Sequence, residues 1–307
     1  MINGAEKMNK AENKRKENVT NKRRNGVKLS ESISFRSKIA GISGTLLLLL
    51  GSVLVLYPLI WMISTALKSD AEVMINPSLI PNSIRWDNFS KAWNSAPFDI
   101  YFRNTVFITA LVLIGALISN TLVAYGFAKL NFKGKNMIFM CVLGTMMIPG
   151  MVTMIPSYVL FSKIGWVGTY LPLIVPAFTG GAYNIFLLRQ SFMGINTAYS
   201  DAAMIEGAGE LKILTKIYIP LARPVLTTIA VFTFNGAWND YFGPMLYLND
   251  EMMYTLQLGL RTFRGSAGVE WQKFMAASLI VLIPTVVLYF FMQKYIIQSV
   301  AIGGVKG

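Results

Sequence analysis

Long stretches without a charged side chain divide this sequence. Five of them have at least 20 residues, covering 39–67, 104–128, 136–162, 164–188 and 274–293. A helix needs about 20 apolar residues to cross the hydrocarbon core of a membrane. A sixth stretch, 224–239, is shorter but continues past Asp240 to Leu248. The sequence therefore predicts an all-α, polytopic membrane protein with six transmembrane helices, the fifth of which requires Asp240 to lie near the membrane interface.

Composition excludes several kinds of chemistry. Only 14% of the residues are charged, against about 25% in soluble domains. Histidine is absent and Cys141 is the single cysteine, so a His-ligated metal site, a Ser-His-Asp triad and an internal disulfide are excluded. The sequence has no GxxxxGK[ST] motif, so we expect no ATP hydrolysis by this chain. A membrane enzyme is disfavoured because no acid, base and nucleophile cluster.

The positive charge is concentrated at the N-terminus. Residues 1–38 contain 11 of the 28 Lys and Arg residues and 4 acidic residues. Residues 1–37 are polar and lack an apolar face, which predicts a disordered basic tail rather than a signal peptide or a nucleic-acid-binding element. With this tail inside, 20 of the 28 basic residues lie on the inner side, as the positive-inside rule requires. We expect a multi-pass protein of the bacterial cell membrane, with both termini cytoplasmic and a transmembrane domain over 38–307 whose first span is 39–67.

Two further patterns concern the spans and the outer loop. Prolines recur inside the spans and predict kinks; they are Pro58, Pro149, Pro156, Pro172, Pro176 and Pro284. The outer loop, 68–103, carries Trp86, Phe89 and Trp93 at helical spacing. This stripe predicts a short amphipathic helix that contacts either a partner protein or the lipid surface.

The loop between the fourth and fifth spans is predicted to form two short helices with a sharp turn. Residues 197–206 favour a helix, with Asn196 or Thr197 as N-cap. Gly207 and Gly209 interrupt it and permit positive φ. Residues 210–219 resume a helix that places three side chains on one face, those of Leu211, Leu214 and Tyr218. Pro220 and Pro224 end this helix and begin the next span.

This loop carries a recognisable pattern: an acid, two alanines, three residues, a glycine, nine residues, and Ile-x-apolar-Pro. The matching residues are Asp201, Ala202, Ala203, Gly207, Ile217, Ile219 and Pro220. The pattern resembles the EAA loop of ABC-importer permeases. Further similar segments begin at Trp86, Phe102, Ala124, Phe132, Ile148, Ile155, Leu221, Trp238 and Gly303. Together they resemble the carbohydrate-uptake branch, and within it the maltose-type second permease subunit. The departures are small: Asp201 replaces the usual Glu and Glu206 replaces the usual Asp.

The resemblance implies a type I ABC importer permease fold with its core at about 100–297 and a cytoplasmic coupling loop at 196–222. It implies a heterodimer with a second permease, two ATP-binding subunits and an extracytoplasmic solute-binding protein that delivers a sugar. The residues it assigns to ATPase coupling are Asp201, Ala202, Ala203, Glu206, Gly207, Ile217 and Pro220, and those of a C-terminal ATPase contact are Gly303, Gly304 and Lys306. ATP and magnesium would be bound by the partner ATPases, and this chain would bind no cofactor and no nucleic acid.

The fifth span offers candidates for the substrate path. They are Asn235, Trp238, Asn239 and Tyr241. Amides hydrogen-bond sugar hydroxyls and aromatic rings stack on sugar faces. The alternative is helix packing with an interfacial aromatic belt. Two other functions stay open: an ABC permease for a non-sugar solute, and an ion-coupled secondary transporter, for which Asp240 is the one candidate coupling residue.

Overall fold

The computed structural model describes residues 44–265 and 268–304, and the side chains of all of these except 265 and 294–304. The chain divides into two compact units, Met1–Trp61 and Met62–Gly307, and each is described by itself. The described part of the first unit belongs to a helix, Gly44–Ala66, whose mean hydropathy of 2.5 and length of 23 residues suit a membrane span. Its side chains from 44 to 58 are all exposed.

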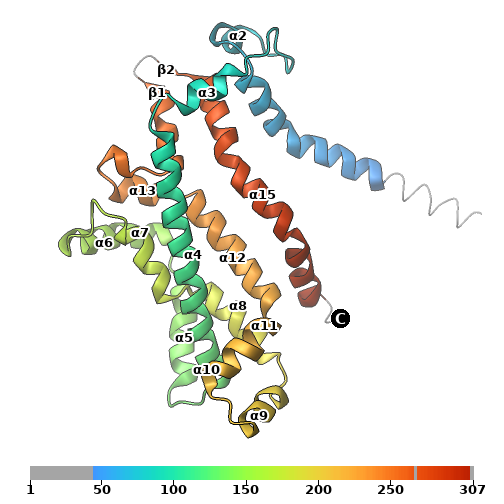
Figure 1. Cartoon of the computed structure of the whole chain (residues 1–307), viewed down its shortest axis with the longest axis vertical. Coiled ribbons are helices and arrows are strands. Elements are labelled where there is room, and N and C mark those ends of the chain that lie inside the picture. Colours follow the sequence, from blue (N-terminus) through green and yellow to red (C-terminus); the bar gives the residue numbers. More distant parts are fainter. Residues whose placement is uncertain (1–43, 266–267, 305–307) are drawn as a thin grey trace, which may run out of the picture. The chain divides into compact units, whose positions relative to one another are not determined.

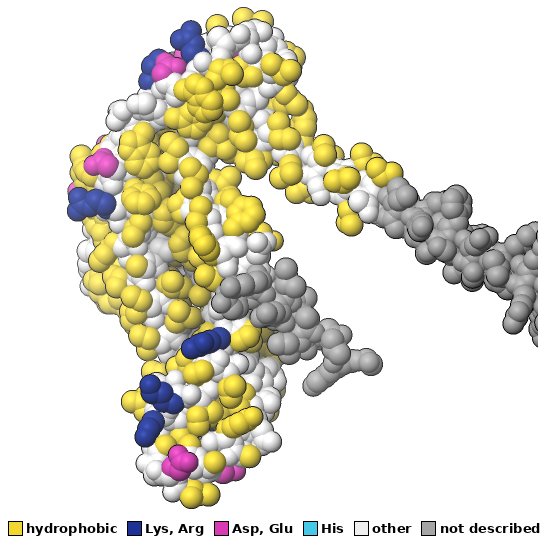
Figure 2. Space-filling model, turned by 45° about the vertical axis from the view of Figure 1, so that its right-hand side comes forward, with side chains coloured by type: hydrophobic (Ala, Val, Ile, Leu, Met, Phe, Trp, Pro, Cys, Tyr) yellow, Lys and Arg dark blue, Asp and Glu magenta, His cyan; other side chains and the backbone are white. Residues whose placement is uncertain are grey.

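The second unit is a helical bundle around one long helix, α4 (Phe98–Lys129). α8 (Ala182–Met193) and α12 (Arg223–Trp238) pack against α4, and α15 (Trp271–Gly304) packs against α12 (Figure 1). Short elements precede α8, namely α7 (Leu171–Ile174) and the 3₁₀ helix η1 (Val175–Thr179). Figure 2 shows a largely hydrophobic surface on this unit, with charged side chains toward its upper and lower parts. This distribution suits a bundle that crosses a membrane.

Two hydrophobic clusters lie at opposite ends of the bundle. One surrounds Phe98, Tyr101 and Trp238, beneath α2 (Asp70–Ile75) and α3 (Asp87–Trp93); we name this the α3 end. The other surrounds Tyr125 and Tyr218, beside α9 (Ala198–Ile205); we name this the α9 end. The α3 end also holds short elements: α13 (Phe242–Tyr247), η3 (Glu251–Met253), α14 (Leu256–Gly259), η4 (Leu260–Phe263) and the hairpin β1 (Arg264–Gly265) and β2 (Gly268–Val269).

The predicted six spans are reached only when two bent helix pairs are each counted as one. Four helices of the described chain are long and apolar enough to span alone: Gly44–Ala66, Phe98–Lys129, Leu171–Met193 and Trp271–Gln293. α5 (Lys135–Thr145) and α6 (Gly150–Lys163) meet at an angle of 98°. Pro149 is the N-cap of α6 with an extended backbone, so the predicted kink there is a full break. The pair Glu210–Leu221 and Arg223–Trp238 is bent by 81°.

The predicted extension of the fifth span to Leu248 is wrong. α12 ends at Trp238, and α13 begins at Phe242. The Asp240 carboxylate accepts a hydrogen bond from the backbone N–H of Gly243 at 3.0 Å, so it caps the start of α13 instead of lying within a continuous helix.

The predicted outer loop of 68–103 is shorter than expected, because α4 already begins at Phe98. Its helix α3 is present, but its aromatic stripe is divided. Trp86 is 70% exposed, whereas Phe89 and Trp93 pack against the cluster at the α3 end. Of the three rings only that of Trp86, which stacks on Phe89, is exposed.

Buried polar groups fasten the α3 end. The Lys68 ammonium, 2% exposed, donates to the carbonyl oxygens of Asn76 (2.9 Å) and Ser78 (2.6 Å). The Glu72 carboxylate accepts from the backbone N–H of Asn82 at 2.6 Å, and this bond holds the pKa of Glu72 below its usual value. The buried Asn88 amide donates to the carbonyls of Ala66 and Lys68. These bonds pair the polar groups that folding removes from water.

Candidate functional site

The helix α9 begins as predicted. Of the two predicted N-cap residues, Thr197 occupies the N-cap position but makes no side-chain cap bond. The Asn196 side-chain oxygen, one residue earlier, accepts the backbone N–H of Ala198 at 3.0 Å. Ser200 is buried and its hydroxyl donates to the Thr197 carbonyl at 2.7 Å. The first turn of α9 is therefore held by two side-chain hydrogen bonds, one from Asn196 and one from Ser200.

The two glycines after α9 differ. Gly207 has φ +79°, in the left-handed region that favours glycine. A Cβ there would meet nothing within 4 Å, so the requirement is conformational and not steric. Gly209 has φ −75°, so the positive φ that a glycine permits is not adopted at this residue. Gly209 is instead the N-cap of α10 (Glu210–Ile213), and its carbonyl accepts from Lys212 and Ile213.

The second helix of the loop is not a uniform α-helix. α10 continues into a π-helical turn, η2 (Leu214–Tyr218), and then into α11 (Ile219–Leu221). Pro220 lacks an N–H and cannot donate to the preceding turn. The wider turn shifts the face of the helix. Leu214 and Tyr218 are buried as predicted, but Leu211 is 69% exposed and Ile213 takes its place inside.

Side-chain contacts fix the loop to α4. The Tyr125 hydroxyl of α4 donates to the Glu210 carboxylate at 2.5 Å. The Lys129 ammonium donates to the Ile195 carbonyl at 3.0 Å and lies 5.0 Å from the centre of the Tyr218 ring. The Tyr218 hydroxyl lies 3.2 Å from the Ser200 hydroxyl oxygen. α9 is thus bonded to η2 through Ser200, and the segments on either side of α9 are bonded to the end of α4 through Ile195 and Glu210.

The predicted coupling residues occupy two environments. Asp201, Ala202, Glu206 and Gly207 are exposed. The other three, Ala203, Ile217 and Pro220, are half-buried, and Ala203 and Ile217 pack against the cluster at the α9 end. Neither Asp201 nor Glu206 forms an ion pair within the described chain. The loop therefore presents acidic groups outward while its hydrophobic side holds it in place.

Five exposed hydrophobic side chains of this loop were not among the predicted site residues. They are Tyr199, Met204, Ile205, Leu211 and Leu221, which are 59%, 49%, 88%, 69% and 51% exposed. Figure 1 shows α9 at the tip of its unit, far from α3. The sequence signal that could have identified them is the presence of apolar residues in a loop rich in charged residues. Exposed apolar groups clustered among acids form a surface suited to a protein partner.

The substrate-path candidates separate by burial. Trp238 is 3% exposed, donates to the Val281 carbonyl at 3.0 Å and stacks on Phe234. Tyr241 packs half-buried against the same cluster. Both rings therefore hold the α3 end together. The prediction that Trp238 lines a path is not supported by its burial.

Asn235, near the end of α12, and Asn239, its C-cap residue, are both exposed. The Asn239 amide nitrogen donates to the Asn235 side-chain oxygen at 2.7 Å, and the Gln257 amide donates to the Asn239 side-chain oxygen at 2.9 Å. Sequence reasoning missed Gln257, because it lies on α14, outside the spans. Exposed amides are costly against lipid, so this chain of three amides belongs against protein or water.

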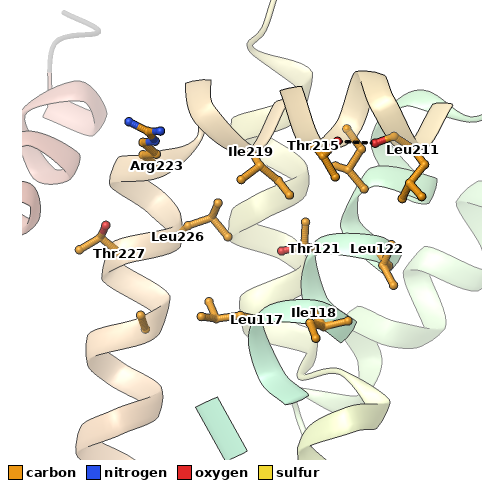
Figure 3. A pocket seen from close by; sticks show the side chains of 12 residues that line it. Leu117, Ile118, Thr121, Leu122, Leu211, Thr215, Ile219, Arg223, Leu226 and Thr227 are labelled. Carbon is orange, nitrogen blue, oxygen red and sulfur yellow. Dashed lines mark hydrogen bonds between the residues drawn. The ribbon is translucent and has the colours of Figure 1, made fainter. Parts of the chain in front are cut away.

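An apolar pocket of about 560 Å³ lies between α4, the loop helices and α12 (Figure 3). Leu117, Ile118 and Leu122 come from α4, and Leu226 comes from α12. Arg223 stands at one edge, with its guanidinium turned away from the apolar side chains in Figure 3. With few hydrogen-bonding groups, this pocket does not have the chemistry of a sugar site.

The remaining predicted residues lie at the end of α15. Gly303 and Gly304 are its last residues, and Lys306 lies outside the described chain. Among the described residues, no group of three His, Cys, Asp or Glu side chains could hold a metal ion.

Comparison with known proteins assigns the family. Residues 112–302 match the family described as the inner membrane component of binding-protein-dependent transport systems. The arabinooligosaccharides transport system permease protein AraQ of Halalkalibacterium halodurans is 32% identical over 255 residues, which cover 82% of this chain and 91% of the relative. The sn-glycerol-3-phosphate transport system permease protein UgpE of Yersinia enterocolitica is 30% identical over 262 residues, covering 82% and 93%.

A solved structure supports the same family assignment. A chain of a bacterial ABC transporter involved in the import of the acidic polysaccharide alginate superposes with a TM-score of 0.74 at 27% identity. The alignment covers 84% of this chain and 97% of that one. The predicted family and helical permease fold are thereby confirmed. This chain belongs to the family of binding-protein-dependent transport system inner membrane components, the multi-pass permeases of ABC transporters.

Proposed function

We propose that this chain is the permease subunit that forms half of the translocation path of a carbohydrate ABC importer. Its substrate is a sugar or oligosaccharide delivered by an extracytoplasmic binding protein. Support comes from relatives named for arabinooligosaccharides and from the structural neighbour named for alginate. A second permease and two ATP-binding subunits complete the transporter, and ATP with magnesium is bound by those subunits.

The single observation that carries this proposal is the loop at the α9 end. It exposes Asp201, Glu206 and Ile205 while Tyr125 and Lys129 tie its other side to α4. A part that exposes apolar and acidic groups, yet is bound firmly to a long helix, is built to receive a partner and to pass on its movement. The partner is the ATPase, so the α9 end faces the cytoplasm, as do both termini.

The translocation surface is the amide chain of Asn235, Asn239 and Gln257. These amides offer both donors and acceptors to sugar hydroxyls. Phe232 and Phe242 are 54% and 55% exposed and lie close in sequence to these amides, where a ring could stack on a sugar face. Trp238 and Tyr241 act behind this surface as packing groups.

Uptake into proteoliposomes tests the proposal. The full transporter, with its binding protein outside and ATP inside, is offered a panel of labelled sugars. We expect accumulation of at least one sugar that requires both ATP and the binding protein. Accumulation driven by an ion gradient without ATP would overturn it. Asn239→Ala should reduce uptake, whereas Asn249→Ala, a matched change at an exposed amide away from α12, should not.

A second candidate substrate rests on the relative named for sn-glycerol-3-phosphate. The same panel separates it. Uptake of glycerol phosphate without uptake of any neutral sugar would assign the non-sugar solute.

A further inference from the structure

We propose that a cationic pocket at the α9 end binds the phosphate of an anionic phospholipid in the adjoining leaflet. The pocket, of about 480 Å³, lies where α4 ends, α5 begins and α8 ends. It is separate from the loop surface and from the amide chain. The inference rests on the proposed function only for the side of the membrane that this end faces.

The charge of the pocket is not neutralised by the protein. Lys135 and Arg189 line it, and Lys129 and Lys133 lie within six residues of Lys135 along the chain. Among the described residues, none of these four side chains forms an ion pair with a carboxylate. The two cations that line the pocket, Lys135 and Arg189, repel one another, and an anion bound in the pocket relieves that repulsion.

The two lining cations are held in place but keep free donors. The Arg189 Nε donates to the Phe127 carbonyl at 3.1 Å, and the guanidinium carbon lies 4.1 Å from the centre of the Phe139 ring. The Lys135 ammonium donates to the Leu130 carbonyl at 2.8 Å. These are their only hydrogen bonds to described residues. A fixed guanidinium with unused N–H groups is well suited to phosphate.

The start of α5 adds neutral donors. Gly134, with φ +80°, is its N-cap, and no side chain caps this end. The backbone N–H groups of Asn136 and Met137 have no backbone acceptor. The side-chain amides of Asn131 and Asn136 also line the pocket. Backbone N–H groups without an acceptor at a helix start attract an anion, so this helix start and the two cations favour the same kind of ligand.

The apolar surroundings favour a lipid over a free anion. Met137, Ile138 and Met140 on α5 are 75%, 48% and 68% exposed, and Phe132 beside the pocket is 44% exposed. These side chains follow the cationic residues directly along α5. A phospholipid satisfies both surfaces, because its phosphate meets the cations while its acyl chains cover the apolar residues. A soluble phosphate would satisfy only the first.

Lipid retention tests this site. The full-length chain, purified with the subunits that accompany it, is placed in phosphatidylcholine nanodiscs containing a minor fraction of phosphatidylglycerol. Native mass spectrometry then counts the phosphatidylglycerol molecules retained. Lys135→Gln should lower retention about fivefold relative to wild type, the effect of removing one basic group at a charged membrane surface. Lys135→Arg should preserve it.

The matched control is Lys212→Gln, an exposed lysine at the same end that lies outside the pocket. It removes the same net charge, so equal loss in both variants would reduce the effect to general electrostatics and overturn the proposal. If inorganic phosphate displaces the retained phosphatidylglycerol, the pocket binds a soluble anion and the proposal fails. If Lys135→Gln loses the ATPase subunit but keeps its lipid, the pocket is a protein contact and the proposal fails. Retention is read without transport, so failure of the proposed uptake would leave this result interpretable.

Discussion

The two ends of the bundle differ in how far their polar and apolar side chains are buried. At the α3 end, Lys68, Glu72 and Asn88 are buried and hydrogen-bonded, and Trp238 is enclosed by the hydrophobic cluster. At the α9 end, Ile205 and Asp201 are exposed. At the α3 end these polar groups are paired within the chain, although Met74, Ile75 and Ile80 on its surface are exposed, whereas Asp201 has no ion-pair partner among the described residues. Substitutions of the buried groups at the α3 end should therefore impair folding, and those of the exposed loop residues at the α9 end should impair assembly.

The largest expected effect is at Trp238. Trp238→Ala removes a buried ring stacked on Phe234 and leaves the Val281 carbonyl without its donor. We expect the free energy of unfolding to fall by about 3–5 kcal/mol. Denaturant unfolding of the purified chain in detergent measures this. Asn239→Ala, one position along, should unfold near the wild-type midpoint, and a wild-type midpoint for Trp238→Ala would contradict the assignment of this ring to packing.

Asp201→Lys tests the α9 end. The residue is exposed and unpaired within the described chain, so reversing its charge should leave folding unchanged. Against a cation of the ATPase, loss of such a pair costs about 2–5 kcal/mol. Co-purification of the ATPase should fall by more than tenfold. Asp99→Lys, an exposed acid at the α3 end, is the control, and equal ATPase recovery from both variants would remove the loop from its coupling role.

The pair Gly207→Val and Gly209→Val sharpens the same test. Gly207 has φ +79°, which Val disfavours by about 1–3 kcal/mol. Gly209 has φ −75° in open space, so Val there avoids the positive-φ penalty and loses only the preference for Gly at an N-cap. We expect weaker ATPase docking for the first variant and near-normal docking for the second. Equal behaviour of the two variants would show that the turn at Gly207 does not position α9.

Sequence reasoning reached the helical class and the family because charge-free stretches and the spacing from Asp201 to Pro220 are local patterns. It placed the kink at Pro149 and the helix end at Pro220, but it did not give the size of the two bends, 98° and 81°. It could not place Trp238, because an indole in an apolar helix suits a lipid interface and a core equally, and α15 decides between them. It could not find Gln257, which meets Asn239 only through the folding of the intervening chain. The roles of the coupling residues and of the domain limits stay predictions.

Trp86 is the exposed aromatic residue of the stripe at the α3 end. Trp86→Ala removes a 70% exposed ring, so unfolding should not change. If α3 receives the binding protein, its affinity for the transporter should fall by about fivefold, corresponding to about 1 kcal/mol for a peripheral aromatic contact. Titration of the binding protein measures it. Phe89→Ala should instead lower stability, because this ring packs inward. Unchanged affinity in Trp86→Ala would favour contact with lipid.

The smallest expected effect is a dependence of the α3 end on pH. The Asn82 N–H lowers the pKa of Glu72. A carboxyl whose folded pKa is depressed contributes stability above its unfolded pKa and loses it as pH falls through the folded value. The loop from Ser69 to Asn82 should therefore resist protease at neutral pH and become more sensitive only below about pH 4.5, the unfolded value. An acid-active protease such as pepsin measures the cleavage rate across that range.

Glu72→Gln keeps an acceptor but cannot ionise, so its cleavage should depend less on pH than that of wild type. At the α9 end the carboxylate that Tyr125 bonds, Glu210, is exposed, so parallel acid sensitivity of both ends would mean that Glu72 is not the group responsible.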